Sequence, residues 1–163
     1  MASGDTLVVF TPYNNVPTAT NFASLDLRNL HPCLDFDPTT NESAVFTGVM
    51  PRNYAAGGVT VYIHWAASTS VDDATHCFWD AGFELCTGLD LDGDSFAAVN
   101  SVDTDHPSST TGIETVTAIT FTDGADMDSV IAGALFRLII TRDAANDNMT
   151  GDAEVLAIEV KET

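Results

Sequence analysis

Short segments of the chain alternate hydrophobic and polar residues, and a period of two is typical of β-strands that bury one face. The clearest case is the segment 76–86, in which Trp79 and Phe83 share one face while Asp80 and Glu84 fall on the other. The apolar face is expected to lie in a core. The acidic face is expected to lie on the surface.

The same reading applied along the whole chain predicts many short strands and little helix. The predicted strands are 7–10, 33–36, 44–50, 59–67, 76–86, 95–102, 115–121, 135–141 and 153–160. Clusters of Gly, Pro, Asn and Asp separate them at short intervals, a pattern typical of a β-sandwich or barrel. One helical turn is expected within 128–134, where Asp128 or Ser129 can cap the start and Gly133 can stop it.

The composition favours the same fold class. The chain has 163 residues, of which 45% are hydrophobic, so one ordered domain spanning 1–163 is expected rather than a disordered chain. Strand-forming Val, Thr, Ile and Phe are plentiful. Residues 1–22 hold one short apolar run between turn residues, and they are predicted to form either an edge strand or an N-terminal arm that reaches a neighbour.

The charge of the chain excludes several classes of partner. Five Lys and Arg residues against 24 Asp and Glu residues give a formal net charge of −19. Binding to nucleic acid or to an anionic membrane needs a basic surface, so neither partner is expected. The first residues carry no positive charge, and no apolar stretch reaches the length of a secretory signal or a membrane span.

The three cysteines, Cys33, Cys77 and Cys86, are an odd number in a chain with no predicted secretion signal. Disulfide frameworks use even numbers in secreted proteins, and the spacing here is not that of a zinc site. All three are therefore expected to be buried free thiols.

A candidate calcium site is formed by Asp90, Asp92 and Asp94, three carboxylates at alternate positions of a loop that contains a glycine. Hard cations bind clustered oxygen ligands, and this spacing can bring the carboxylates together. The loop is not an EF-hand, because serine stands where that motif needs Gly and Glu. The alternative is a solvated acidic turn, and no other metal and no cofactor is predicted.

No catalytic residues are predicted. The chain has no nucleophile elbow, and its histidines show no metal-binding spacing. Glu84 is the one acid on a strongly apolar strand that suggests a glycosidase carboxyl, but its alternation places it on the outer face with Asp80. Four aromatic residues could line a carbohydrate platform: Trp65, Trp79, Tyr54 and Tyr62. Core packing is nevertheless the expected role of the two tryptophans.

Four segments together resemble small jelly-roll virion proteins encoded by tailed bacteriophages. They are 46–65, which reads FTGVMPRNYAAGGVTVYIHW, and 121–130, 135–143 and 151–160, which read FTDGADMDSV, LFRLIITRD and GDAEVLAIEV. The resemblance implies a single-domain antiparallel β-sandwich of the jelly-roll type with about eight strands. It carries no catalytic signature.

The resemblance implies a capsid decoration (cement) protein that is made in the host cytoplasm and resides in the virion. Such a protein would associate with itself, as a trimer for example, and with the major capsid protein or another virion protein. Its contacts would come from residues 1–22 or from an aromatic outer face with Tyr62 and Phe78. Two alternatives stay open: a carbohydrate- or receptor-binding module of a tail fibre or spike, and a sandwich-fold glycan hydrolase with two facing carboxyls.

Overall fold

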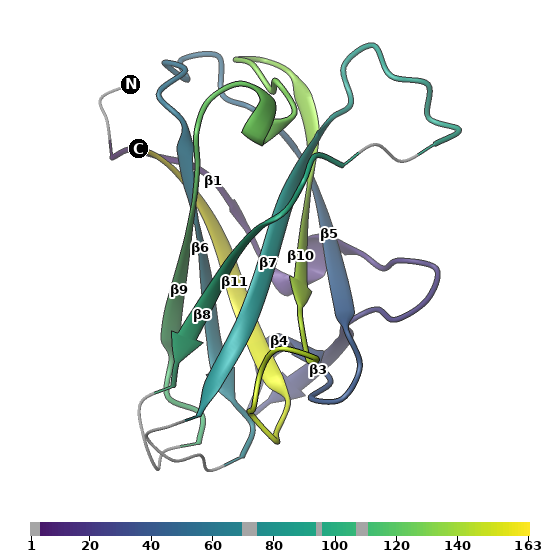
Figure 1. Ribbon diagram of the computed structural model, residues 1–163, viewed down its shortest axis with the longest axis vertical. Helices are drawn as coiled ribbons and strands as arrows, with labels where there is room; N and C mark the ends of the chain where they lie inside the picture. The colour runs from purple at the N-terminus through teal and green to yellow at the C-terminus, as the bar shows by residue number, and fades with distance from the viewer. Residues whose placement is uncertain (1–3, 70–74, 94–95, 107–110) are drawn as a thin grey trace.

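The computed structural model describes residues 4–69, 75–93, 96–106 and 111–163, which form two antiparallel sheets packed face to face (Figure 1). The six-stranded sheet contains β3 (Ser24–Arg28), β4 (His31–Phe36), β11 (Ala153–Glu162), β6 (Val59–Ala67) and β9 (Thr115–Phe121) in spatial order, with β1 (Thr6–Phe10) also paired to β11. The five-stranded sheet contains β2 (Asn15–Val16), β5 (Glu42–Val49), β10 (Leu135–Arg142), β7 (His76–Leu85) and β8 (Asn100–Asp105). The predicted all-β jelly-roll sandwich is confirmed.

Neighbouring strands come from distant parts of the chain, as in Greek-key connections. The last strand, β11, lies between β4 and β6, and β10 lies between β5 and β7. Residues 4–22 contribute to both sheets, because β1 pairs with β11 and β2 pairs with β5. Two single-turn 3-10 helices, η1 (Pro12–Asn14) and η2 (Ala125–Met127), are the helices of the described residues. Neither is long and apolar enough to cross a bilayer.

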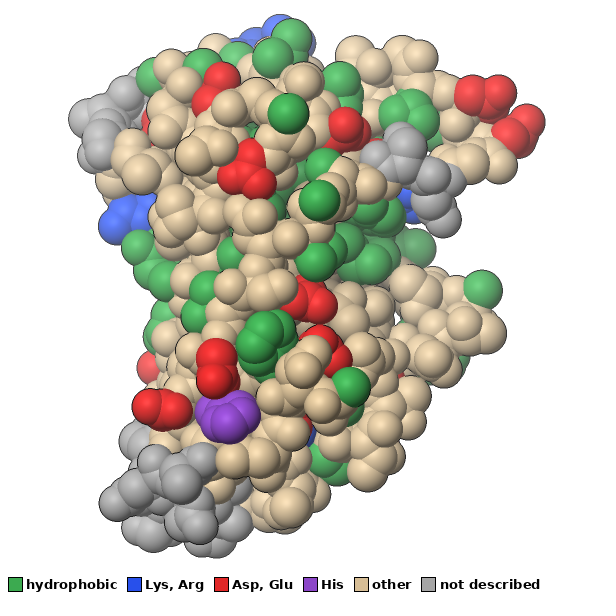
Figure 2. Space-filling view, in the orientation of Figure 1, with side chains coloured by type: hydrophobic (Ala, Val, Ile, Leu, Met, Phe, Trp, Pro, Cys, Tyr) green, Lys and Arg blue, Asp and Glu red, His purple; other side chains and the backbone are tan. Residues whose placement is uncertain are grey.

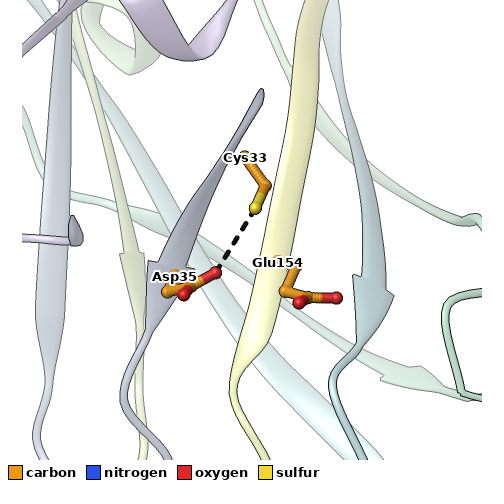
Figure 3. A group of neighbouring side chains, drawn as sticks. All are labelled: Cys33, Asp35 and Glu154. Carbon is orange, nitrogen blue, oxygen red and sulfur yellow. Dashed lines mark hydrogen bonds between the residues drawn. The ribbon is translucent and has the colours of Figure 1, made fainter. Parts of the chain in front are cut away.

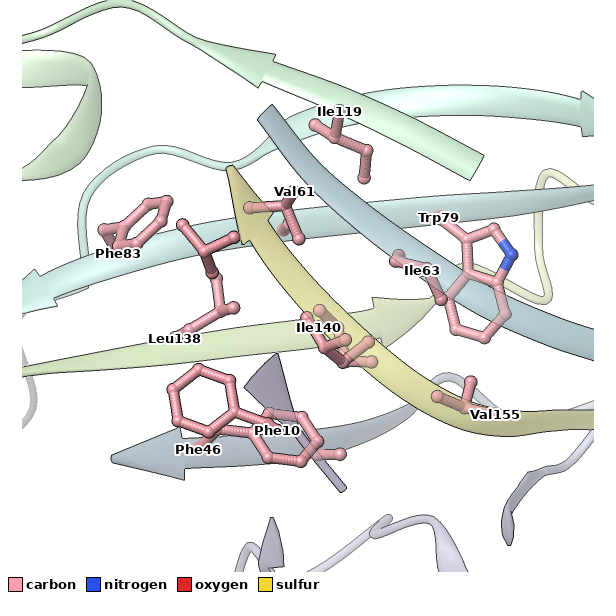
Figure 4. Close-up of a cluster of buried hydrophobic side chains, with 14 of the residues drawn as sticks. Phe10, Phe46, Val61, Ile63, Trp79, Phe83, Ile119, Leu138, Ile140 and Val155 are labelled. Atoms are coloured by element: carbon pink, nitrogen blue, oxygen red, sulfur yellow. The ribbon is translucent and has the colours of Figure 1, made fainter. Parts of the chain in front are cut away.

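The core lies between the sheets and is built by the residues that the alternation assigned to the inner faces. Figure 4 shows side chains from both sheets meeting there. Aromatic rings make edge-to-face contacts across it, with centroids 5.1 Å apart for Phe36 and Trp79 and 5.0 Å apart for Phe83 and Phe121. Such pairs add to the free energy gained by burying the rings. The three cysteines are free and buried, as expected.

Two expected elements differ from the structure. The expected helical turn in 128–134 is wrong: the 3-10 helix lies earlier, and Asp128 and Ser129 after it both adopt left-handed backbone angles (φ 51° and 58°). Two such residues in succession cannot continue a right-handed helix. The strand predicted at 95–102 begins only at Asn100, because residues before it fold over the sheet: a Cβ on Gly82 would lie 3.3 Å from Val99 Cγ1.

The loop between β5 and β6 is held by Tyr54, which is buried. Its hydroxyl donates to Asp123 Oδ1 (2.9 Å) and accepts from the Gly58 N–H (3.1 Å). Burial, followed by the hydrogen bond to Asp123, raises the pKa of Tyr54 to about 12, so the hydroxyl stays a donor at neutral pH. At Gly58 the φ is +88°, and a Cβ there would lie 2.5 Å from the Phe121 carbonyl oxygen.

We expect Gly58→Ala to lower the free energy of unfolding by about 1–3 kcal/mol, a typical cost for a side chain forced into the left-handed region, before the clash with Phe121 is counted. Gly57→Ala is the matched control, because its Cβ would make an ordinary 3.6 Å contact with the Thr163 carbonyl oxygen. Urea denaturation of both variants tests this. Equal losses would show that the backbone at position 58 is not the cause.

Arg142 is a fully buried cation on the core side of β10, in line with Phe136 and Ile140. Its guanidinium is surrounded by acceptors. It donates to both carboxylate oxygens of Asp147 (2.6 and 3.3 Å) and to three main-chain carbonyls, those of Phe36 (2.9 Å), Met149 (2.7 Å) and Gly151 (2.8 Å). The side chain therefore ties the loop between β10 and β11 to β4 of the opposite sheet.

We expect Arg142→Met to destabilise the fold by about 3–5 kcal/mol, because it leaves the Asp147 carboxylate buried without its cation. Arg52→Met, at an exposed arginine, is the control and should change stability little. The double variant Arg142→Met/Asp147→Leu removes the orphaned charge and should recover part of the loss in chemical denaturation. A double variant no more stable than the single one would refute this explanation.

Candidate functional site

A groove crosses the outer face of the five-stranded sheet. Two segments project beside it: residues 12–22, between β1 and β3, and the described residues between β7 and β8, which are 86–93 and 96–99 (Figure 1). Figure 2 shows the hollow between these projections, with hydrophobic side chains exposed in it. The groove consists of two adjoining cavities of about 210 and 240 Å³, and Arg137 lines both.

The floor of the groove is set by strand register. Arg137 of β10 pairs with Thr47 of β5 on one side and with Glu84 of β7 on the other. Paired residues of neighbouring strands point to the same side of a sheet, so these three polar side chains form one row across the floor. Ile139, two residues further along β10, continues the floor with an apolar side chain.

Arg137 is held between a carboxylate and an aromatic ring. Its Nε donates to Glu84 Oε2, and its Cζ lies 4.8 Å from the centroid of the Phe96 ring. The Glu84 side chain is 2% exposed, whereas that of Arg137 is 28% exposed. The expected surface position of Glu84 is therefore half right: it lies on the outer face of β7, but residues of the connection that follows β7, among them Leu89 and Leu91, surround it.

The walls of the groove are mainly apolar. Leu89 and Leu91 line one end, and Val16 and Pro17 line the other, with Phe96 between them. A groove with apolar walls and a few polar groups on its floor is typical of sites for small molecules or flexible chains. The sequence pattern singled out Glu84 and predicted the strand that carries Arg137. It did not predict the two projecting segments that form the walls.

Two of the three candidate calcium ligands lie in the segment that forms one wall of this groove, beside Leu91. Asp90 and Asp92 are exposed, and the Asp92 N–H donates to Asp90 Oδ1 (3.1 Å), as in a turn closed by an aspartate side chain. Asp94 lies outside the described residues. The calcium site stays a prediction.

The aromatic residues considered for a sugar-binding platform lie in different parts of the fold and differ in burial. Trp65 and Trp79 are fully buried, with centroids 5.9 Å apart, so their expected core role is confirmed. Tyr62 is half-buried, and Lys161 Nζ lies 5.7 Å from its ring centroid. The expected common outer face of Tyr62 and Phe78 is wrong, because β6 and β7 belong to different sheets.

A second pocket, of about 360 Å³, lies on the outer face of the six-stranded sheet and is lined by Arg28, His31, Cys33 and Glu154, among others. Beside it, Cys33, Asp35 and Glu154 form the one group of potential metal ligands in the described part of the chain (Figure 3). The Cys33 thiol donates to Asp35 Oδ1 (3.5 Å).

The chemistry of this group does not favour a metal. Burial, and then the neighbouring Asp35 charge, raises the pKa of the Cys33 thiol to about 12, so the sulfur keeps its proton at neutral pH. Glu154 is paired with Arg28, whose Nη1 also donates to the Ala67 carbonyl (3.2 Å). A cation would have to displace both the thiol proton and the guanidinium, so we interpret the group as part of the packing of β4 on β11.

Comparison with solved structures identifies carbohydrate-binding modules of the same fold. The CBM36-1 domain of a multidomain xylanase from the hindgut metagenome of Trinervitermes trinervoides is 10% identical, with 96% of this chain and 97% of that domain covered and a TM-score of 0.52. A family 35 carbohydrate-binding module from an environmental isolate is 11% identical, with 96% and 94% covered and a TM-score of 0.55.

The xylan-binding module CBM15 is also similar, at 12% identity, with 96% of this chain and 97% of that module covered and a TM-score of 0.52. At such low identities the likeness establishes the shared fold, and function has to be argued from the site. No protein-family model matches the chain, and neither does any curated protein.

We expect Asp35→Asn to stabilise the protein at neutral pH. Burial raises the pKa of Asp35 from its ordinary 3.8 to about 6, so the folded chain retains a proton that the unfolded chain has lost. The free energy of unfolding therefore falls as pH rises through this window. The gain from Asn should be on the order of 1 kcal/mol at pH 7, since water still screens the half-buried carboxyl, and should be small at pH 4.

Urea denaturation of both proteins at pH 4 and pH 7 measures this difference. A gain that is the same at the two pH values would contradict the assignment, because it would not depend on ionisation of Asp35.

Proposed function

We propose that the protein binds carbohydrate, and that the groove over the five-stranded sheet holds a segment of a glycan chain. The observation that carries the proposal is the row of Thr47, Arg137 and Glu84 below apolar walls. A sugar ring presents hydroxyl groups at its rim and C–H groups on its faces. Thr47 and Arg137 can hydrogen-bond the hydroxyl groups, and Phe96 can pack against a C–H face.

The shared fold supports this proposal. The similar solved structures cover nearly the whole chain and are carbohydrate-binding modules, one of which is a xylan-binding module. They favour the alternative drawn from the sequence, a carbohydrate-binding jelly-roll module, over capsid decoration. The virion location that the resemblance implies stays a prediction.

The charge of the protein narrows the class of glycan. A net charge of −19 repels polyanions, so acidic polysaccharides would approach against an unfavourable potential. Among the described residues that line the groove, Arg137 is the one cation, and it is already paired with Glu84. A neutral polysaccharide is therefore the expected ligand.

Binding without bond cleavage fits the residues of the groove better than hydrolysis does. A glycosidase of the usual kind uses two carboxyl groups on opposite sides of the scissile bond. Among the described residues that line the groove, Glu84 is the one carboxylate, and its partner is Arg137. We propose a binding module that performs no chemistry on its ligand.

We expect the protein to be retarded by soluble xylan or another neutral polysaccharide in affinity gel electrophoresis, and less by polygalacturonate. Phe96→Ala should weaken the binding about tenfold, as loss of one ring contact of about 1.4 kcal/mol would. The substitution leaves the pair of Arg137 with Glu84 in place.

Tyr62→Ala is the matched control, because Tyr62 is a half-buried aromatic residue on the outer face of the other sheet. Its affinity should equal that of the unmodified protein. A loss in Tyr62→Ala but not in Phe96→Ala would move the site to the six-stranded sheet. Failure to bind any polysaccharide of a neutral panel would overturn the proposed function.

A further inference from the structure

The strand β3 is an open edge of the six-stranded sheet. In the described part of the chain it pairs with β4 and with no other strand. The opposite edge, β9, is tied to β8 of the other sheet: Thr117 Oγ1 donates to Thr104 Oγ1 (2.8 Å), and the Asn100 side-chain amide donates to the Thr120 carbonyl (2.8 Å). β3 has neither lysine, proline nor a bulge, three features that commonly protect an edge from pairing, although it carries the charged residues Asp26 and Arg28.

The hairpin geometry identifies the free backbone groups of β3. Asn29 and Leu30 form a two-residue turn with positive φ at both positions (48° and 67°), so the closing pair of Arg28 and His31 is a hydrogen-bonded pair. The hydrogen-bonded pairs alternate from there. The N–H and C=O groups of Leu25 and Leu27 therefore point away from β4, in agreement with Pro32, which stands opposite Leu27 and has no N–H.

The side chains of this edge are apolar on one side. Leu25 and Leu27 point to the core side, since Leu25 pairs with the buried Leu34, yet they are 54% and 55% exposed. Leu30 at the tip of the turn is 88% exposed and holds a backbone conformation that favours Gly, Asn or Asp. Three exposed leucines, one of them in a costly conformation, are not explained by the packing of a single copy.

The same strand is complementary to itself in charge. If two copies of β3 pair antiparallel about a two-fold axis at Leu27, Asp26 of each copy stands opposite Arg28 of the other. The Arg28 guanidinium, which already bonds Glu154 and the Ala67 carbonyl of its own chain, would then extend its ion pair to Asp26 of the second copy. The free N–H and C=O groups of Leu27 then bond to those of the second Leu27. On the other side of the new ribbon, the leucines of the two copies meet.

We propose that the occupant of this edge is a second copy of the chain, and that the protein forms a two-fold dimer by antiparallel pairing of β3 in this register. A two-fold contact uses the same patch on both copies, as a self-complementary strand requires. The dimer does not rest on the proposed function. The contact uses none of the residues that line the groove, because β3 belongs to the other sheet.

The net charge of −19 sets the conditions for this dimer. Two such copies repel each other, and at low ionic strength the repulsion reaches well beyond the contact. Added salt screens the long-range repulsion more than it weakens the short-range hydrogen bonds and leucine contacts. We therefore expect the dimer to strengthen from low salt to ~0.3 M NaCl, where the screening length is a few ångströms.

Sedimentation velocity of the full chain tests the proposal. Protein concentrations from ~10 µM to ~1 mM cover the dissociation constants expected of a small interface. The dimer should accumulate with concentration and with salt. Leu27→Lys should abolish it, because two ammonium groups would face each other at the axis. Ile131→Lys is the control with the same change of charge at an exposed apolar residue away from β3, and it should dimerise like the unmodified protein.

Amide hydrogen exchange followed by NMR tests the register without a substitution. The Leu27 amide should exchange rapidly in dilute samples and at least ~tenfold more slowly in concentrated ones, whereas the Asp26 and Arg28 amides, already bonded to β4, should be slow in both. A protein that stays monomeric at the highest concentration and salt would overturn the proposal. A dimer that survives Leu27→Lys, or that leaves the Leu27 amide in rapid exchange, would overturn it too.

Discussion

The alternation of side chains along β10 connects the core of the protein to its surface groove. Phe136, Leu138 and Ile140 point into the core, and Arg137 and Ile139 therefore point to the groove floor. A slip of one residue would place the arginine in the core and the aromatic ring in water, so burial of one face fixes the position of the other. β10 lies between β5 and β7, which carry the partners of Arg137 on the same row.

The few cations of this acidic chain are mostly committed to ion pairs inside the fold. Three of its four arginines bind carboxylates: Arg28 binds Glu154, Arg137 binds Glu84, and Arg142 binds Asp147. Each pair joins residues from different strands or from a strand and a loop. The remaining acidic groups are left in large excess on the surface, which favours neutral ligands over anionic ones.

The two sheets carry different surface features. The five-stranded sheet has the groove, whose walls come from residues 16–19 and from the described residues between β7 and β8. The six-stranded sheet has the open edge β3 and a polar pocket in which Arg28 already neutralises Glu154. A dimer through β3 would present two grooves, and two linked sites can bind a polymeric ligand more tightly than one without any new contact.

The period of two in the sequence was enough to predict an all-β sandwich and most of its strands, because one face of each strand must be apolar to build a core. It did not reveal the buried Arg142, which lies one residue beyond the predicted strand 135–141 and whose charge is not expected in a core. β3 was missed since its residues are almost all exposed, so no burial pattern marks it. The groove was missed for a different reason: its walls are irregular segments, and their positions depend on contacts such as Phe96 on Arg137 that join residues distant in sequence.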